Sequence, residues 1–200
     1  MSLKKKFDPL HAMKAAGFKL VNSKSIPTDD GACWEATLAF GTQKLVRAFD
    51  GGFGGEVEID ILATPKLPLD AIRSRLATFI ALPAIQSLLK DSLIESEGYS
   101  LEFKTITQAQ FDANKAKILA ADVALDNHAI ELAIQSLADT HESLAAIKRK
   151  LKTCICFTTP GDDEKGQWRW AKAPDTPANR EFLRKRDNVD YFLADVVAGL

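Results

Sequence analysis

The chain has 200 residues and a formal net charge of −1; 46% of its residues are hydrophobic and 26% are charged. These values are typical of a soluble globular protein, and the length suits a single domain covering residues 1–200. The sequence excludes several classes of protein. No apolar segment approaches the roughly 20 residues of a membrane-spanning helix, none follows the basic start as in a secretory signal, and three cysteines do not build a disulfide framework. We expect a cytoplasmic protein with no membrane partner.

The near-neutral total conceals an uneven distribution of charge. Residues 148–186 contain eleven Lys/Arg and five Asp/Glu, whereas residues 1–147 contain fifteen and nineteen. An asymmetry of this kind indicates an anionic partner for the basic segment.

The first third of the chain predicts a helix and then an antiparallel meander. Residues 10–16 fit a short helix and residues 18–21 a strand. In residues 32–40, Trp34, Ala36, Leu38 and Phe40 fall on one face and the residues between them on the other, which is the period of a strand. Residues 44–50 predict another strand, and residues 56–62 alternate between three acidic and three aliphatic side chains.

The cluster Gly51-Gly52-Phe53-Gly54-Gly55 allows two interpretations. A phosphate-binding glycine loop leads from a strand into a helix, whose first amides face the anion. Here the glycines lead into a segment with the period of a strand, and no Gly-Lys-Ser/Thr follows. We therefore interpret the cluster as a corner between two antiparallel strands.

The middle of the chain predicts helices. Residues 69–90 are helical with a kink near Pro83, and residues 95–104 predict a loop and a short strand. A helical block covers 107–150 with a break near 120–122, and we interpret it as a helical insertion, a helical hairpin or a helical layer. Apolar residues recur every seven positions at Val123, Ile130, Leu137, Leu144 and Leu151, so self-association through residues 123–151 is the alternative.

The last quarter predicts a return to strands. Residues 152–159 and 166–173 flank a polar turn and predict a hairpin. Thr176 and Pro177 fit the start of a helix, and residues 188–200 predict a final one. Strands that are grouped, with helices between the groups, predict an α+β fold whose antiparallel sheet combines the N-terminal meander with the C-terminal hairpin.

Histidines and cysteines give no convincing catalytic or metal site. His128 and His141 are thirteen positions apart, which places them about 220° apart around one helix. Cys154 and Cys156 share a strand face with Cys33 as a third thiol, but zinc needs four ligands, and buried thiols that pack as small hydrophobes are the simpler interpretation. We predict no catalytic residue, no metal and no cofactor.

The sequence Trp168-Arg169-Trp170 is the most unusual cluster of side chains. In a strand, both indoles point to one face of the sheet and Arg169 to the other. On a buried face the tryptophans are large core anchors; on an open face, with the nearby cations, they stack on single-stranded bases or contact a partner protein. The candidate binding residues are Trp168, Arg169, Trp170, Lys148, Arg149, Lys150, Lys152, Arg184 and Arg186.

Two segments resemble small proteins encoded by bacteriophages, prophages and plasmids. One is KLVRAFDGGFGGEVEID, residues 44–60; the other runs from LKTCICFTTPGDDEKGQWRWAKAP to NREFLRKRD, residues 151–187. In those proteins the corner often carries a Gly-Gly-Cys-Asn-like step, whereas here Glu56 and Val57 follow the glycines. The resemblance implies an accessory gene of a mobile element and supplies no catalytic residue.

We therefore expect a non-enzymatic interaction protein that binds a host or element-encoded protein, in the manner of counter-defence factors. Two alternatives stay open. One is a nucleic-acid-associated protein that uses the basic segment 148–186. The other is an enzyme whose site the sequence does not reveal.

Overall fold

The computed structural model describes residues 3–29, 31–52 and 57–200. The chain forms two compact units, each described here by itself. The meander unit is Ala12–Ala138, and the hairpin unit is Met1–His11 together with Asp139–Leu200. Helices α1 (Leu3–Ala15) and α5 (Asn127–Leu151) contribute residues to both units.

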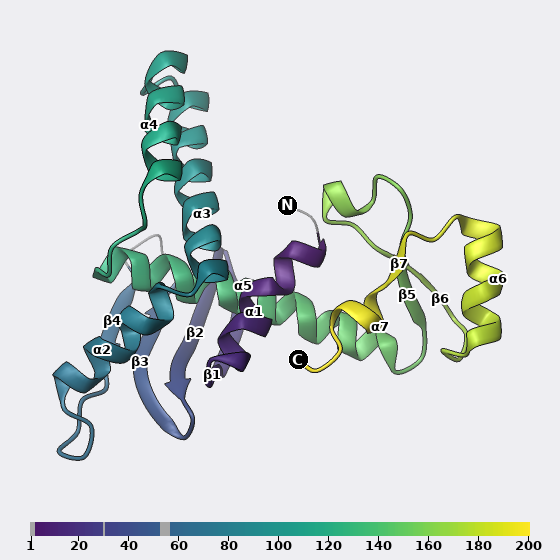
Figure 1. Cartoon of the computed structure of the whole chain (residues 1–200), viewed down its shortest axis with the longest axis horizontal. Helices are drawn as coiled ribbons and strands as arrows, with labels where there is room; N and C mark the ends of the chain where they lie inside the picture. Colours follow the sequence, from purple (N-terminus) through teal and green to yellow (C-terminus); the bar gives the residue numbers. More distant parts are fainter. Residues whose placement is uncertain (1–2, 30, 53–56) are drawn as a thin grey trace. The chain divides into compact units, whose positions relative to one another are not determined.

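The meander unit contains a four-stranded antiparallel sheet with the strand order β1-β2-β3-β4 (Figure 1). The register aligns Ala36 with Ala48 and Leu38 with Val46, and all four side chains are buried on one face of the sheet. The N-terminal meander is thereby confirmed, and alternation along β2 places the residues as predicted. The strands are β1 (Phe18–Thr28), β2 (Gly31–Phe40), β3 (Gln43–Asp50) and β4 (Glu58–Ile61).

A strand follows the glycine cluster, as the corner interpretation requires. β3 and β4 pair antiparallel, with Phe49 opposite Glu58 and Val46 opposite Ile61. Gly52 has φ 74°, a conformation that glycine adopts without steric cost, and its N–H donates to the Asp50 carboxylate at 2.8 Å. The rest of the corner, residues 53–56, lies outside the described residues.

Three helices follow the sheet. α2 (Leu69–Ile80) and α3 (Pro83–Glu102) meet at a bend of 77°, and Pro83 occupies the first turn of α3 as the predicted kink requires. Along the described parts of the chain, no single helix is long and apolar enough to cross a membrane; α2 and α3 meet the length and composition criteria only when taken together across their bend.

The prediction of a loop and a strand over residues 95–104 is wrong, because α3 continues to Glu102. α4 (Gln108–Ala120) packs along α3 and forms a helical hairpin with it (Figure 1), and the Asn114 side chain donates to the Glu97 carboxylate at 2.9 Å. Gly98 costs a helix about 1 kcal/mol relative to alanine. The contact between α3 and α4 joins residues that are distant in the chain, and local sequence patterns do not register it.

The predicted break in the helical block is present between α4 and α5. Gln86, which is buried, fixes this linker: its side chain donates to the Val123 carbonyl at 2.9 Å and accepts from the Val123 N–H at 2.8 Å. In the heptad stripe, Ile130, Leu137 and Leu144 are buried within the chain. The stripe therefore packs in the protein's own core.

The hairpin unit contains a second antiparallel sheet with the strand order β6-β5-β7. The predicted C-terminal hairpin is present as β5 (Ile155–Thr158) and β6 (Arg169–Ala171). It does not extend the meander sheet, because β7 (Tyr191–Phe192) occupies the other edge of β5. The α+β class is confirmed, with two sheets in place of the single sheet expected.

The end of the chain differs from the single helix predicted for residues 188–200. α6 (Pro177–Asp187) is followed by Asn188 in the left-handed conformation at φ 51°, which ends the helix. β7 then pairs Phe192 with Phe157, and only the short α7 (Leu193–Val196) is helical. Ile155, Phe157, Leu183 and Phe192 form the buried core under this sheet.

Candidate interaction surface on the hairpin unit

Trp170 lies on β6, an edge strand, with 53% of its surface exposed. The Lys150 ammonium group, from the last turn of α5, sits 3.5 Å from the centroid of its ring. This is a cation–π contact at a solvent-facing position, worth about 0.5–1 kcal/mol. Trp168 precedes the strand and is half-buried. The structure thus leaves one of the two predicted indoles open.

Basic side chains flank this contact along the chain. Arg149 and Lys152 neighbour Lys150, and Lys172 follows Trp170; all three are exposed and make no ion pair with any residue that the structure describes. Lys148 differs, because its ammonium group donates to the Leu200 carbonyl at 2.7 Å. We use the name Trp170 surface for the set of Arg149, Lys150, Lys152, Trp170 and Lys172.

Arg169 takes part in a polar network. Its Nε and Nη2 donate to the buried Asp162 carboxylate at 2.8 and 3.2 Å. The same carboxylate accepts from the Thr159 N–H at 3.0 Å and from the Thr159 hydroxyl at 2.7 Å. The Arg169 hydrogen bonds, then those from Thr159, hold the pKa of Asp162 well below its usual range. Arg169 therefore ties the turn of the hairpin to β6.

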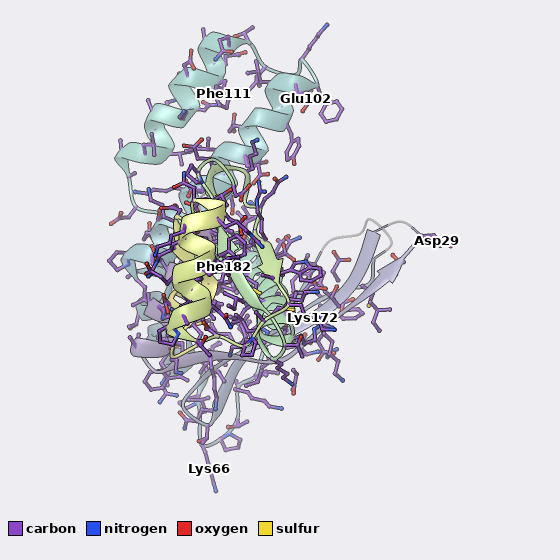
Figure 2. All side chains as sticks on the ribbon, turned by 90° about the vertical axis from the view of Figure 1, so that its right-hand side faces the viewer. Asp29, Lys66, Glu102, Phe111, Lys172 and Phe182 are labelled. Carbon is purple, nitrogen blue, oxygen red and sulfur yellow. The ribbon has the colours of Figure 1, made fainter. Side chains whose placement is uncertain are left out.

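Helix α6 presents a second aromatic side chain. Thr176 caps its first turn by accepting from the Asn179 N–H at 3.3 Å, as its sequence predicts. Phe182 is 58% exposed, with the Arg186 guanidinium 5.3 Å from its ring centroid. Figure 2 labels Phe182 on this helix.

The other predicted cations of α6 are engaged inside the unit. Arg186 forms an ion pair with Asp187 at 2.6 Å, which lowers the pKa of that carboxyl group. The Arg184 guanidinium lies 5.1 Å from the ring centroid of Phe192. Of the nine predicted binding residues, the structure brings Lys150 and Trp170 into contact, with Arg149 and Lys152 beside them in the chain. Arg169, Arg184 and Arg186 are directed toward partners of their own.

Sequence reasoning missed Phe182 and Asp162. Phe182 and Leu183 are adjacent in an otherwise polar helix, and Leu183 alone is buried in α6. The two side chains lie about 100° apart around the helix, and the sequence gives no signal as to which of them is buried. The choice of Asp162 has no signal either, because four carboxylates lie within residues 162–175.

The other candidate chemistries form no cluster. His128 is exposed and lies 3.6 Å from the Glu131 carboxylate, and the His11 ring lies 3.0 Å from the Val196 carbonyl. Burial raises the pKa of the Cys156 thiol to about 11, which keeps it protonated near neutral pH. Over residues 3–29, 31–52 and 57–200, no group of three His, Cys, Asp or Glu side chains could hold a metal ion.

Comparison of the chain with family models, curated proteins and solved structures found no match.

Proposed function

We propose that this protein is a cytoplasmic, non-enzymatic binding protein of a phage or other mobile element, and that it binds a host or element-encoded protein through the Trp170 surface. The observation that carries the proposal is the half-exposed indole of Trp170, held on an edge strand beneath the Lys150 ammonium group. Tryptophan is among the side chains that most often dominate the energy of a protein interface, because its rigid ring buries a large area at a low cost in conformational entropy.

The contacts around Trp170 favour a protein over a nucleic acid as the partner. A base would stack on a free ring face, and the Lys150 ammonium group occupies one face of this ring. Arg169 and Arg186, two cations of the basic segment, are neutralised by Asp162 and Asp187. Arg149, Lys152 and Lys172, which form no ion pair within the described part of the chain, then complement an acidic segment on the partner.

Affinity capture with matched variants tests this proposal. Tagged wild-type protein and the variants Trp170→Ala and Tyr99→Ala are used to capture partners from host lysate, with and without nuclease. Tyr99 is the control, since it is an aromatic residue that is 55% exposed on α3 in the meander unit. Loss of a hot-spot side chain costs 2 kcal/mol or more, which is roughly a thirtyfold weaker affinity.

We expect a defined protein to survive nuclease treatment, to be captured equally by wild type and Tyr99→Ala, and to be lost with Trp170→Ala. Circular dichroism of the variants checks that each is folded. A protein captured equally by the wild type and both variants would refute the assignment to the Trp170 surface. Capture that disappears with nuclease would replace the protein partner with a nucleic acid, and no specific capture at all would refute a binding function.

A further inference from the structure

The meander unit has a pocket of about 620 Å³ on the face of its sheet opposite the core. Thr37 pairs with Arg47 across β2 and β3, one position along from the buried pair Leu38 and Val46, so these two residues point to the opposite face. The segment after β4 forms a wall, anchored by the Leu62 N–H donating to the Leu45 carbonyl at 2.9 Å. The lining residues are Asn22, Glu35, Thr37, Gln43, Lys44, Arg47, Leu62, Thr64, Lys66 and Leu67.

The pocket combines three cations with one carboxylate. Arg47 donates through Nε to Glu35 at 3.0 Å and lies 3.6 Å from Asp60 through Nη1, which fixes its guanidinium over the sheet. Its remaining nitrogen, Nη2, makes no hydrogen bond with a described residue, and the guanidinium carbon lies 5.7 Å from the centroid of the Phe49 ring. Lys44 and Lys66 are exposed and make no ion pair within the same part of the chain. With Asp60 counted beside Glu35, three cations face two carboxylates, so the local charge is positive by one.

Neutral groups complete the lining. Thr37 is only 2% exposed and lines the pocket, and its hydroxyl makes no hydrogen bond with a described residue, so it is available to a bound ligand. The side chains of Leu62 and Leu67 form the apolar part of the pocket wall. A cavity of several hundred Å³ with apolar walls and a few polar groups is typical of sites for small molecules.

We infer that this pocket binds a small organic phosphate. The phosphate group binds to Lys44, to Lys66 and to Nη2 of Arg47, because a dianion gains more from several cations than a monocarboxylate does. The organic body lies against Leu62 and Leu67. The inference rests on the meander unit alone and is independent of the proposed protein partner.

The test is a titration of the full chain with phenyl phosphate and with inorganic phosphate, followed by amide chemical shifts and by calorimetry. The variant is Lys44→Gln combined with Lys66→Gln, which removes no ion pair between residues that the structure describes. Lys19→Gln is the control, because Lys19 is an exposed lysine of the same sheet outside the pocket. A lost charge-assisted hydrogen bond weakens binding by about tenfold or more.

We expect saturable binding of phenyl phosphate with shifts at Thr37 and Arg47, weaker binding of inorganic phosphate, and at least about a tenfold loss in the double variant but none in the control. The absence of saturable binding, shifts confined to residues outside the pocket, or equal affinity of the double variant and the control would overturn the site. Equal affinity for phenyl phosphate and inorganic phosphate would show that the pocket does not bind the organic part of the ligand.

Discussion

At the scale of single residues, Asp162 holds the turn between β5 and β6 in its folded conformation. Its carboxylate is buried and accepts two hydrogen bonds from Thr159 and two from Arg169. A carboxylate in this position is stabilised as the anion, and its pKa is held well below the ordinary value. Because the folded pKa lies below the unfolded one, ionised Asp162 contributes stability above about pH 4, and this contribution disappears as the pH falls toward the folded pKa.

The substitution Asp162→Asn is therefore expected to lower the urea midpoint at pH 7, because the charge-assisted bonds to Arg169 and Thr159 are weakened. The difference between wild type and variant should narrow as the pH falls from about 5 toward 2, because the unfolded wild-type chain takes up a proton at this carboxyl group before the folded protein does. Urea unfolding of both proteins at several pH values measures this difference in midpoint. Asp8→Asn, at an exposed carboxylate on α1, serves as the control. A difference that stays constant with pH would contradict the role given to the charge.

At the scale of secondary-structure elements, helices α5 and α4 differ in how much of their surface is buried. α5 buries Ile130, Leu137 and Leu144 at heptad spacing, so its position is specified by packing. In α4 no residue is buried, and Leu119 is 54% exposed. α4 begins with a capping box in which Thr107 and Gln110 satisfy each other's backbone N–H groups. Local bonds therefore contribute more to α4 than burial does.

Equivalent truncations in the two helices should differ in their effect on stability. Leu137→Ala removes a fully buried side chain and is expected to cost about 2–5 kcal/mol. Leu119→Ala removes an exposed one and should change the free energy of unfolding by about 0.5 kcal/mol or less. Urea denaturation of both variants gives the two values. Similar costs for the two substitutions would mean that Leu119 is covered in solution.

At the scale of the whole molecule, charge follows the division into units. The hairpin unit contains fourteen Lys/Arg and eleven Asp/Glu, and the meander unit twelve and sixteen. A net charge of −1 therefore combines a positive unit with a negative one. An acidic protein approaching the Trp170 surface is attracted at long range, and that attraction acts on the rate of association.

Given the proposed partner, association should slow as salt is added, while dissociation changes little. Raising the ionic strength from about 0.01 M to about 0.15 M shortens the Debye length from roughly 30 Å to roughly 8 Å. Kinetics on immobilised partner measure both rates. Charge-neutralised Lys152→Gln should show a smaller salt dependence than wild type, and Lys115→Gln, on α4, should match wild type. An association rate that does not respond to salt would contradict electrostatic attraction.

Part of this structure was predictable because it depends on neighbours in the chain. The alternation in residues 32–40 specified β2 and its buried face, and the same period after Gly55 identified a strand rather than a phosphate-binding helix. Thr176 and Pro177 marked the start of α6. In each case the deciding interaction lies within a few residues, as a pleat or a helix cap does.

By itself the sequence determined the α+β class, the meander, the hairpin and the separation of charge. Only the tertiary structure decided that the hairpin forms a separate sheet and that α3 continues past Gly98. It also decided that Trp170 is exposed while Arg169 binds Asp162, and that Arg47 lines a pocket. These features depend on contacts between residues far apart in the chain. A period of two or of 3.6 states which side chains share a face, but the elements that pack against that face determine whether it is covered.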